Sequence, residues 1–327
     1  MEFRVALAQI NTVLGDVSAN LEKHIQLSET AKSEHADLII FPELSLTGYV
    51  LKDLALTVAM DPLTHPHFSR LKQASRRIDL MAGFVEIDRR GRFYIAAAYL
   101  SKGEIVHIHR KVYLPTYSIF DEKRFFTPGN RVRAFETRFG RAGMLICEDF
   151  WHISTPYLLW LDGADLFFCN AASPGHGMNS SDRLDSERQV ETILSTYAGL
   201  FTSFFAYTNR TGYEDGLNFP GGAMALDPGG NCLVRAGMDE GLTIASFDTE
   251  ELNRRRFRLP LLRDERPELV LSELNRILRG GESLDDVVES RRGDRKPLGF
   301  RQSPVVINPE IEHNPDEAEQ DHADSGL

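Results

Sequence analysis

The sequence contains eight short runs of apolar residues, separated by turn residues or by amphipathic stretches. The runs are RVALAQI, DLIIFPEL, LMAGFVEI, IAAAYL, AGMLIC, DLFFCNAA, SFFAYTNR and LTIASFD. Continuous runs of Val, Ile, Leu, Phe and Ala of this length are typical of strands that are buried on both faces. The pattern therefore predicts an α/β fold with helices covering buried sheets.

The stretches between the runs indicate both helices and hairpins. Residues 17–34 carry apolar positions at helical spacing, and residues 181–200 open with Ser181 and Asp182 as candidate N-caps. Residues 92–111 and 133–146 are typical of antiparallel strand pairs around a Lys-Gly turn and a Phe-Gly turn. The sheets are therefore predicted to be mixed.

The character of the chain changes after about residue 250. Residues 251–279 have a helical pattern that Pro260 and Pro267 interrupt, and the final stretch is strongly acidic. We predict one domain over residues 1–250, a C-terminal extension over 251–301 at a subunit interface, and an acidic, disordered tail over 302–327.

Charge and cysteine spacing narrow the class of protein. A formal net charge of −11 argues against a nucleic-acid binder or a protein of the membrane surface, which usually present a basic face. No apolar run approaches the roughly 20 residues that span a bilayer, and the start MEFRVALAQI lacks the pattern of a secretory signal. Cys147, Cys169 and Cys232 are too widely spaced for a CxxC metal site or a disulfide framework. We expect a cytoplasmic protein without a metal.

Four reactive side chains lie at or near the ends of apolar runs, where open α/β sheets bind ligands. They are Glu43, Lys111, Cys147 and, in a following loop, Glu122. A thiol that attacks a carbonyl needs a base to take its proton and a fixed cation or N–H donor for the oxyanion. Glu43 could be the base, Lys111 the cation, and Glu122 a second carboxylate that holds the lysine.

Cys147 precedes two acids, Glu148 and Asp149, which would disfavour a thiolate unless Lys111 offsets them. A cysteine at the end of an apolar strand can also be simple packing, which is our interpretation of Cys169 and Cys232. A Cys–His pair with His152, His107 or His109 is a further alternative that the spacing does not specifically support.

Three motifs occur in order: FPELSLTGY, HRKVYLPTYSIFDEKRFFTPG and GMLICEDFW. About 68 residues separate Glu43 from Lys111, and about 36 separate Lys111 from Cys147. From about residue 3 to 250 the chain resembles the carbon–nitrogen hydrolase (nitrilase) superfamily, and the resemblance implies a Glu43–Lys111–Cys147 triad supported by Glu122. It also implies an α-β-β-α sandwich with two mixed sheets, a homodimer or higher homo-oligomer, a thioester intermediate, and no metal or organic cofactor.

Within that superfamily, FPELSLTGY followed by KDL, and KVYLPTYSIFDEKRFF, are most similar to the glutaminase domain of glutamine-dependent NAD synthetases, although no synthetase domain follows. By that likeness Tyr117, Glu148, Ser173 and Arg183 would line the substrate pocket. We predict an amidase that releases ammonia from a small linear amide. The alternatives are a free-standing glutaminase that supplies a separate synthetase, an N-carbamoyl hydrolase, a nitrilase in the strict sense, and an inactive scaffold.

Overall fold

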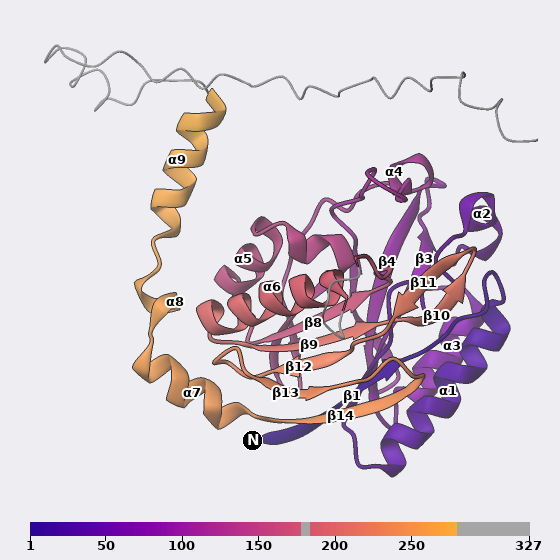
Figure 1. The fold of residues 1–327 in the computed structure, drawn as a ribbon, viewed down its shortest axis with the longest axis horizontal. Coiled ribbons are helices and arrows are strands. Elements are labelled where there is room, and N and C mark those ends of the chain that lie inside the picture. Colours follow the sequence, from indigo (N-terminus) through magenta and orange to yellow (C-terminus); the bar gives the residue numbers. More distant parts are fainter. Residues whose placement is uncertain (178–183, 280–327) are drawn as a thin grey trace, which may run out of the picture. The chain divides into compact units, whose positions relative to one another are not determined.

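The computed structural model of the chain describes residues 1–177 and 184–279, which Figure 1 draws as a coloured ribbon. The chain divides into two compact units, one from Met1 to Pro267 and one that begins at Glu268. The predicted boundaries at residues 250 and 301 stay predictions, and the acidic segment 302–327 lies outside the described residues.

Two six-stranded sheets form the centre of the first unit. The first sheet has the order β14 (Gly241–Asp248), β1 (Glu2–Gln9), β2 (Leu38–Ile40), β3 (Asp79–Ile87), β4 (Phe93–Ser101) and β5 (Glu104–Arg110). The second has the order β13 (Cys232–Arg235), β12 (Met224–Leu226), β9 (Phe204–Asn209), β8 (Leu166–Ala171), β7 (Gly140–Ile146) and β6 (Phe135–Thr137). In each sheet three adjacent strands are parallel and their flanking strands are antiparallel, so the predicted mixed sheets are confirmed.

Helices cover the outer faces of the two sheets. The long ones are α1 (Val17–Ser33), α3 (Pro66–Ala74), α5 (Ser154–Leu161) and α6 (Asp185–Phe201). One core joins α1 and α3 to the first sheet, and a second core fills the space between the sheets and continues beneath α5 and α6. Tyr99 of β4 and Phe168 of β8 stack across that space with ring centroids 5.9 Å apart. The predicted α-β-β-α sandwich is thereby confirmed.

The other elements of the first unit are all shorter than α1 and α6. They are η1 (Lys52–Leu54), α2 (Ala55–Val58), α4 (Glu122–Phe125), η2 (Cys147–Trp151), the hairpin of β10 (Thr211–Glu214) with β11 (Leu217–Pro220), α7 (Thr249–Arg258) and α8 (Leu261–Asp264). The predicted Lys-Gly turn between β4 and β5 has positive φ at both Lys102 (54°) and Gly103 (87°), which suits a tight hairpin.

One helix boundary differs from its prediction. Helix α6 begins at Asp185, and the preceding Leu184 has no side chain that could cap it. The predicted caps Ser181 and Asp182 lie outside the described residues. The apolar spacing that marks the buried face of this helix starts only at Val190, so the sequence pattern could not fix where the first turn begins.

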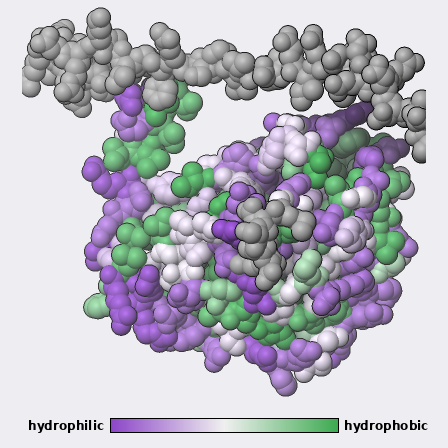
Figure 2. Space-filling view, in the orientation of Figure 1, coloured by the Kyte–Doolittle hydropathy of each residue, from purple (hydrophilic) through white to green (hydrophobic). Residues whose placement is uncertain are grey.

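Helix α9 (Pro267–Arg279) carries most of the described part of the second unit. Figure 2 shows apolar side chains along it, and Leu271, Leu274 and Leu278 are all at least half exposed. Apolar side chains at this spacing on a short helix are typical of a face that packs against another surface. Its proposed place at a subunit interface stays a prediction. Throughout residues 1–177 and 184–279, every helix is too short or too polar to cross a bilayer.

A glycine of the first sheet fixes the path of the chain beside it. Gly83 lies in β3, where the turn that follows β2 passes over the strand. A Cβ atom at this position would lie 2.5 Å from the backbone nitrogen of Leu44 and 2.6 Å from the carbonyl oxygen of Pro42. Because both are backbone atoms, a larger residue has to push the turn that carries Glu43.

We therefore expect Gly83→Ala to lower the free energy of unfolding by about 1–3 kcal/mol, the usual cost of overpacking a filled core. Gly241→Ala in β14 is the matched control, because a Cβ atom there would meet no atom within 4 Å. Urea unfolding of both variants measures the difference. Equal stability of the two variants would contradict the proposed close approach.

Candidate active site

The ends of three strands bring the predicted reactive residues to one edge of the sandwich. Glu43 follows β2, Lys111 follows β5 and Cys147 follows β7. Since β5 is antiparallel to β4, and β4 to β3, β5 runs in the same direction as β2, so both carboxyl ends lie at the same edge. Glu43 and Lys111 therefore come from one sheet and Cys147 from the other.

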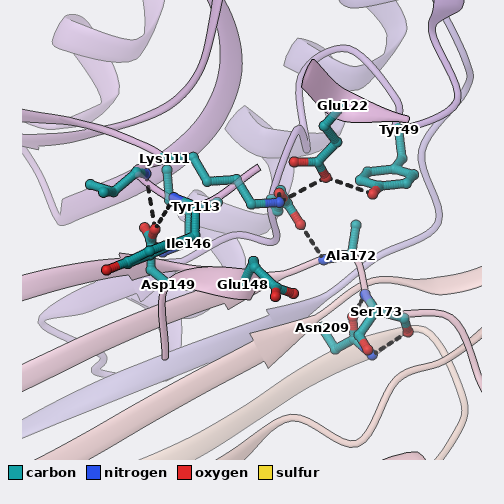
Figure 3. Close-up of polar contacts among 12 residues, drawn as sticks. Tyr49, Lys111, Tyr113, Glu122, Ile146, Glu148, Asp149, Ala172, Ser173 and Asn209 are labelled. Carbon is teal, nitrogen blue, oxygen red and sulfur yellow. Dashed lines mark hydrogen bonds and ion pairs between the residues drawn. The ribbon is translucent and has the colours of Figure 1, made fainter. Parts of the chain in front are cut away.

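Lys111 lies between two carboxylates and is shielded from water. Its Nζ donates to Glu43 Oε1 at 2.7 Å and to Glu122 Oε1 at 2.8 Å, and the lysine side chain has no exposed surface. Figure 3 shows that Glu122 also accepts the hydroxyl of Tyr49, at 2.7 Å. The second oxygen of Glu43 accepts the backbone N–H of Ala172 at 2.9 Å, just beyond β8. The two sheets are thus joined through Glu43.

The charges of this cluster are mutually dependent. Burial alone would lower the pKa of Lys111, but Glu122 and Glu43 outweigh it and raise that pKa well above its ordinary value. Burial also raises the pKa of Glu122 to about 7, although Lys111 pulls it downward. The lysine therefore stays protonated at neutral pH, and burial favours the neutral form of the Glu122 carboxyl.

Cys147 is the first residue of η2, directly after β7, and its backbone is strained. Its φ is +46°, a left-handed conformation that residues other than glycine rarely adopt and that clusters at functional sites. Burial and the charge of Glu43 raise the pKa of its thiol well above the usual range, although Lys111 pulls the other way. Lys111 lowers this pKa by more than Glu148 raises it, so the lysine offsets the acid next to the thiol, but burial and Glu43 outweigh the lysine and favour the neutral thiol.

Asp149 has a structural role that the sequence alone does not show. Its Oδ1 accepts the backbone N–H groups of Val112 and Tyr113, and its Oδ2 accepts that of Ile146. The carboxylate thus ties the residues that follow Lys111 to the residue that precedes Cys147 (Figure 3). Asp149, one of the two acids beside the thiol, therefore links the end of β5 to the end of β7.

The three histidines of the alternative Cys–His arrangement have other partners. His109 Nε2 contacts Asp149 Oδ2 at 2.8 Å, and His107 stacks on Phe135 with centroids 4.4 Å apart. His152 stacks on Tyr113 at 3.7 Å. These contacts favour a structural interpretation of the histidines.

Tyr49 is held by a buried ion pair from the β10–β11 hairpin. Glu214 Oε1 accepts the backbone N–H groups of Tyr49 and Val50, at 2.8 and 2.7 Å. Glu214 Oε2 in turn accepts from Arg210, which is 1% exposed and lies over the ring of Phe219. This ion pair fixes the tyrosine whose hydroxyl reaches Glu122.

The predicted pocket residues are only partly described. Tyr117 donates its hydroxyl to Glu148 Oε2 at 2.8 Å, and Glu148 directly follows Cys147 in the chain. Ser173 follows the residue that bonds Glu43, and its backbone N–H donates to Asn209 Oδ1 at 2.8 Å (Figure 3). Arg183 lies outside the described residues.

Sequence reasoning does not identify Tyr49, Asn209 and Glu214, and it identifies Asp149 only as a charge beside the thiol. Tyr49 closes the motif FPELSLTGY and Asp149 belongs to GMLICEDFW, so both were within quoted motifs. Their partners, however, are backbone groups or side chains from distant segments, and no local pattern identifies them. In the part of the chain that the structure describes, no group of three or more His, Cys, Asp or Glu is arranged to hold a metal ion.

Comparison with known proteins agrees with this architecture. The family model of the carbon–nitrogen hydrolases matches residues 4–257. The glutamine-dependent NAD(+) synthetase of Acinetobacter baylyi is 32% identical over 250 residues, which are 76% of this chain and 45% of that protein. The chain therefore spans less than half the length of this relative.

Solved structures give the same result. The glutamine-dependent NAD+ synthetase of Acinetobacter baumannii superposes with a TM-score of 0.68 at 32% identity, over 77% of this chain and 47% of the other. An amidase of the nitrilase superfamily from Nesterenkonia AN1 superposes with a TM-score of 0.70 at 25% identity, over 83% of this chain and 96% of the other. By its sequence and by its fold, the chain belongs to the carbon–nitrogen hydrolase family.

Proposed function

We propose that this protein is a thiol amidase that hydrolyses a small linear amide and releases ammonia. The main support for the proposal is the buried Lys111, which is held between Glu43 and Glu122. Cys147 lies at the same edge of the sandwich and has a strained backbone. A structural lysine has no need of two carboxylates beside a thiol, whereas acyl transfer needs a base, a cation and a nucleophile together.

In the proposed first half-reaction, the sulfur of Cys147 attacks the amide carbon while Glu43 takes the thiol proton. Proton transfer has to accompany attack, because the pKa of the buried thiol is far too high for a resting thiolate at neutral pH. Lys111 stabilises the oxyanion that forms. When the carbon–nitrogen bond breaks, Glu43 returns the proton to the leaving nitrogen, and ammonia and a thioester result.

In the second half-reaction, water attacks the thioester and gives its proton to Glu43. The oxyanion again forms beside Lys111, and its collapse releases the carboxylic acid and the thiolate of Cys147, which takes the proton back from Glu43. Glu122 stays bonded to Lys111 throughout and holds the ammonium in place. The cycle consumes one water and needs no other reactant.

A dedicated glutaminase is the second candidate, favoured by the similarity to glutamine-dependent NAD synthetases. Glutamine presents an α-ammonium, for which Glu148 is the nearest suitable carboxylate along the chain from Cys147. The hydroxyl of Tyr117 already donates to Glu148, so this pair is better suited to an ammonium than to the α-carboxylate. We propose that the pocket accepts ω-amides broadly, with glutamine a modest substrate.

The first prediction concerns the nucleophile. Cys147→Ala should lower kcat by ~10⁴-fold or more, because removing a covalent nucleophile abolishes the main route. Cys232→Ala is the matched control, since Cys232 is exposed and should be dispensable. Ammonia release and mass spectrometry of acid-quenched enzyme measure turnover and the acyl adduct. Turnover by the Cys147 variant near that of the control would contradict the thioester route.

The second prediction concerns the oxyanion. Lys111→Ala should lower kcat by ~100-fold or more, the scale for losing one oxyanion donor. Lys111→Arg should rescue poorly, because the cavity fits a compact ammonium between two carboxylates. Lys72→Ala on α3 is the control, and circular dichroism checks that each variant is folded. A folded Lys111→Ala enzyme with near-normal kcat would remove the lysine from the mechanism.

The third prediction separates the two candidate functions. In the wild-type enzyme, kcat/KM for glutamine should lie within ~100-fold of that for the corresponding ω-amide without the α-ammonium. Glu148→Gln should lower the value for glutamine by a further ~10-fold or more relative to the deaminated amide, because a bond to a charged group is lost. If wild-type enzyme prefers glutamine by more than ~100-fold, about 2.7 kcal/mol, the dedicated glutaminase is correct.

A further inference from the structure

Glu43, the proposed base, lies in a turn whose backbone is strained. Leu44, the next residue, has a φ of +50°, in the left-handed region that a leucine rarely adopts. Such a conformation costs free energy and persists only where the surrounding structure holds it. The two oxygens of Glu43 also have exact partners, Lys111 Nζ at 2.7 Å and the backbone N–H of Ala172 at 2.9 Å. Whatever holds this turn therefore decides where the carboxylate lies.

Helix α1 presents a strip of buried polar residues toward the turn. The strip consists of Asn20, His24 and Ser28, which lie on one face because they are four residues apart. Asn20 Nδ2 donates to the carbonyl of Leu46 at 3.1 Å, and Ser28 Oγ donates to the carbonyl of His24 at 2.7 Å. Buried polar groups are costly unless they are bonded, so the partners of the strip are part of what holds the helix against the turn.

His24 contacts the chain on both sides of Glu43. Its ring stacks on Phe41, two residues before Glu43, with centroids 3.9 Å apart. Its Nε2 lies 2.9 Å from Ser45 Oγ, two residues after Glu43. Because Nδ1 lies 2.7 Å from the carbonyl oxygen of Asn20, which can only accept, Nδ1 carries the proton and Nε2 accepts from the hydroxyl of Ser45. Burial lowers the pKa of His24 to about 4, so the ring is neutral at neutral pH.

Ser45 extends this contact to the first sheet. Its Oγ accepts the backbone N–H of Gly83 in β3 at 3.2 Å, and the N–H of Leu46 donates to the carbonyl of Gly83 at 3.0 Å. Since the hydroxyl hydrogen of Ser45 is directed at His24, its oxygen is free to accept from Gly83. The histidine thus orients the side chain that bonds the turn to the strand.

We propose that His24 is a positioning residue for Glu43. It holds the strained turn through Phe41 and Ser45 and thereby sets where the carboxylate lies relative to Lys111 and to the thiol. A displacement of about 1 Å at a reacting group can cost ~100-fold in rate, so a residue that only fixes the turn has a large effect on turnover. The inference rests on the proposed role of Glu43 as the base.

Two substitutions separate the two nitrogens of the ring. The amide of Gln can place an acceptor near the position of Nε2, whereas that of Asn reaches only the position of Nδ1. Both lose the stacking on Phe41, so they differ in the bond to Ser45. His24→Asn should lower kcat for ammonia release by ~10-fold or more with KM within ~3-fold, and His24→Gln should lower kcat by at most ~3-fold. Ser28→Ala, in the same strip, is the control and should leave kcat unchanged.

Alkylation of Cys147 by iodoacetamide is a second measurement, which needs no amide turnover. Mass spectrometry gives its rate relative to that of Cys232, which is exposed in the same chain. His24→Asn should slow the alkylation of Cys147 by ~10-fold or more, as Glu43→Gln does, because both impair the base that takes the thiol proton. His24→Gln should stay within ~3-fold of wild type.

Circular dichroism checks the folding of each variant, and Ser45→Ala, which removes the same bond from the other side, should behave like His24→Asn. Equal alkylation of Cys147 in the folded Gln and Asn variants of His24, or no effect of Glu43→Gln, would overturn the proposal. If the wild-type protein releases no ammonia from any amide, the proposed function fails, and the alkylation rates still decide whether His24 positions Glu43.

Discussion

A lysine without contact to water, shared by two carboxylates, constrains the rest of this structure. Removing a single ion from water costs several kcal/mol, and the attraction between partners repays this only when the geometry is good and each polar atom is bonded. Lys111 is bonded to Glu43 and Glu122, and Ala172 and Tyr49 bond the carboxylates in turn, so of the four carboxylate oxygens only Glu122 Oε2 lacks a partner among the described residues. Loss of Lys111 would leave two buried carboxylates without a counter-charge.

The cluster therefore depends on how accurately several segments are placed. Gly83 allows the turn with Glu43 to lie directly on β3, and Glu214 fixes the backbone that carries Tyr49. Asp149 bonds the segment after Lys111 to the end of β7, beside the thiol. None of these three residues needs to touch a substrate. Each one determines where a reactive group can be, so the chemistry rests on the packing of both sheets.

How far the sequence predicts this arrangement differs between kinds of residue. The strands and the mixed sheets follow from apolar runs and turn residues, because burial on both faces imposes a local composition. Glu43, Lys111 and Cys147 stand out since each is a reactive residue at the end of such a run. That reasoning found the three residues, and the geometry agrees with it for the pairing of Lys111 with Glu43 and Glu122.

Other features depend on contacts that no local pattern encodes. The sequence shows Asp149 only as a charge beside the thiol, whereas its carboxylate accepts hydrogen bonds from backbone groups of a segment about 36 residues away. The start of α6 was placed too early, because polar first turns carry little apolar periodicity. The net direction of the pKa of Cys147 could not be foreseen either, since it is decided mainly by burial.

The pairing of β1 with β14 gives the first unit a ring-like connectivity. Glu2 lies opposite Asp248 and Gln9 opposite Gly241, so the strand that begins the fold is bonded to one that comes after the whole second sheet. The chain thus leaves the first sheet after β5, forms the second sheet, and returns to the first sheet at β14, where it pairs with β1. A circular permutant that joins these two ends and opens an exposed turn would keep every contact of the site. A chain cut before β14 would instead leave β1 as an unpaired edge strand, open to pairing with other chains.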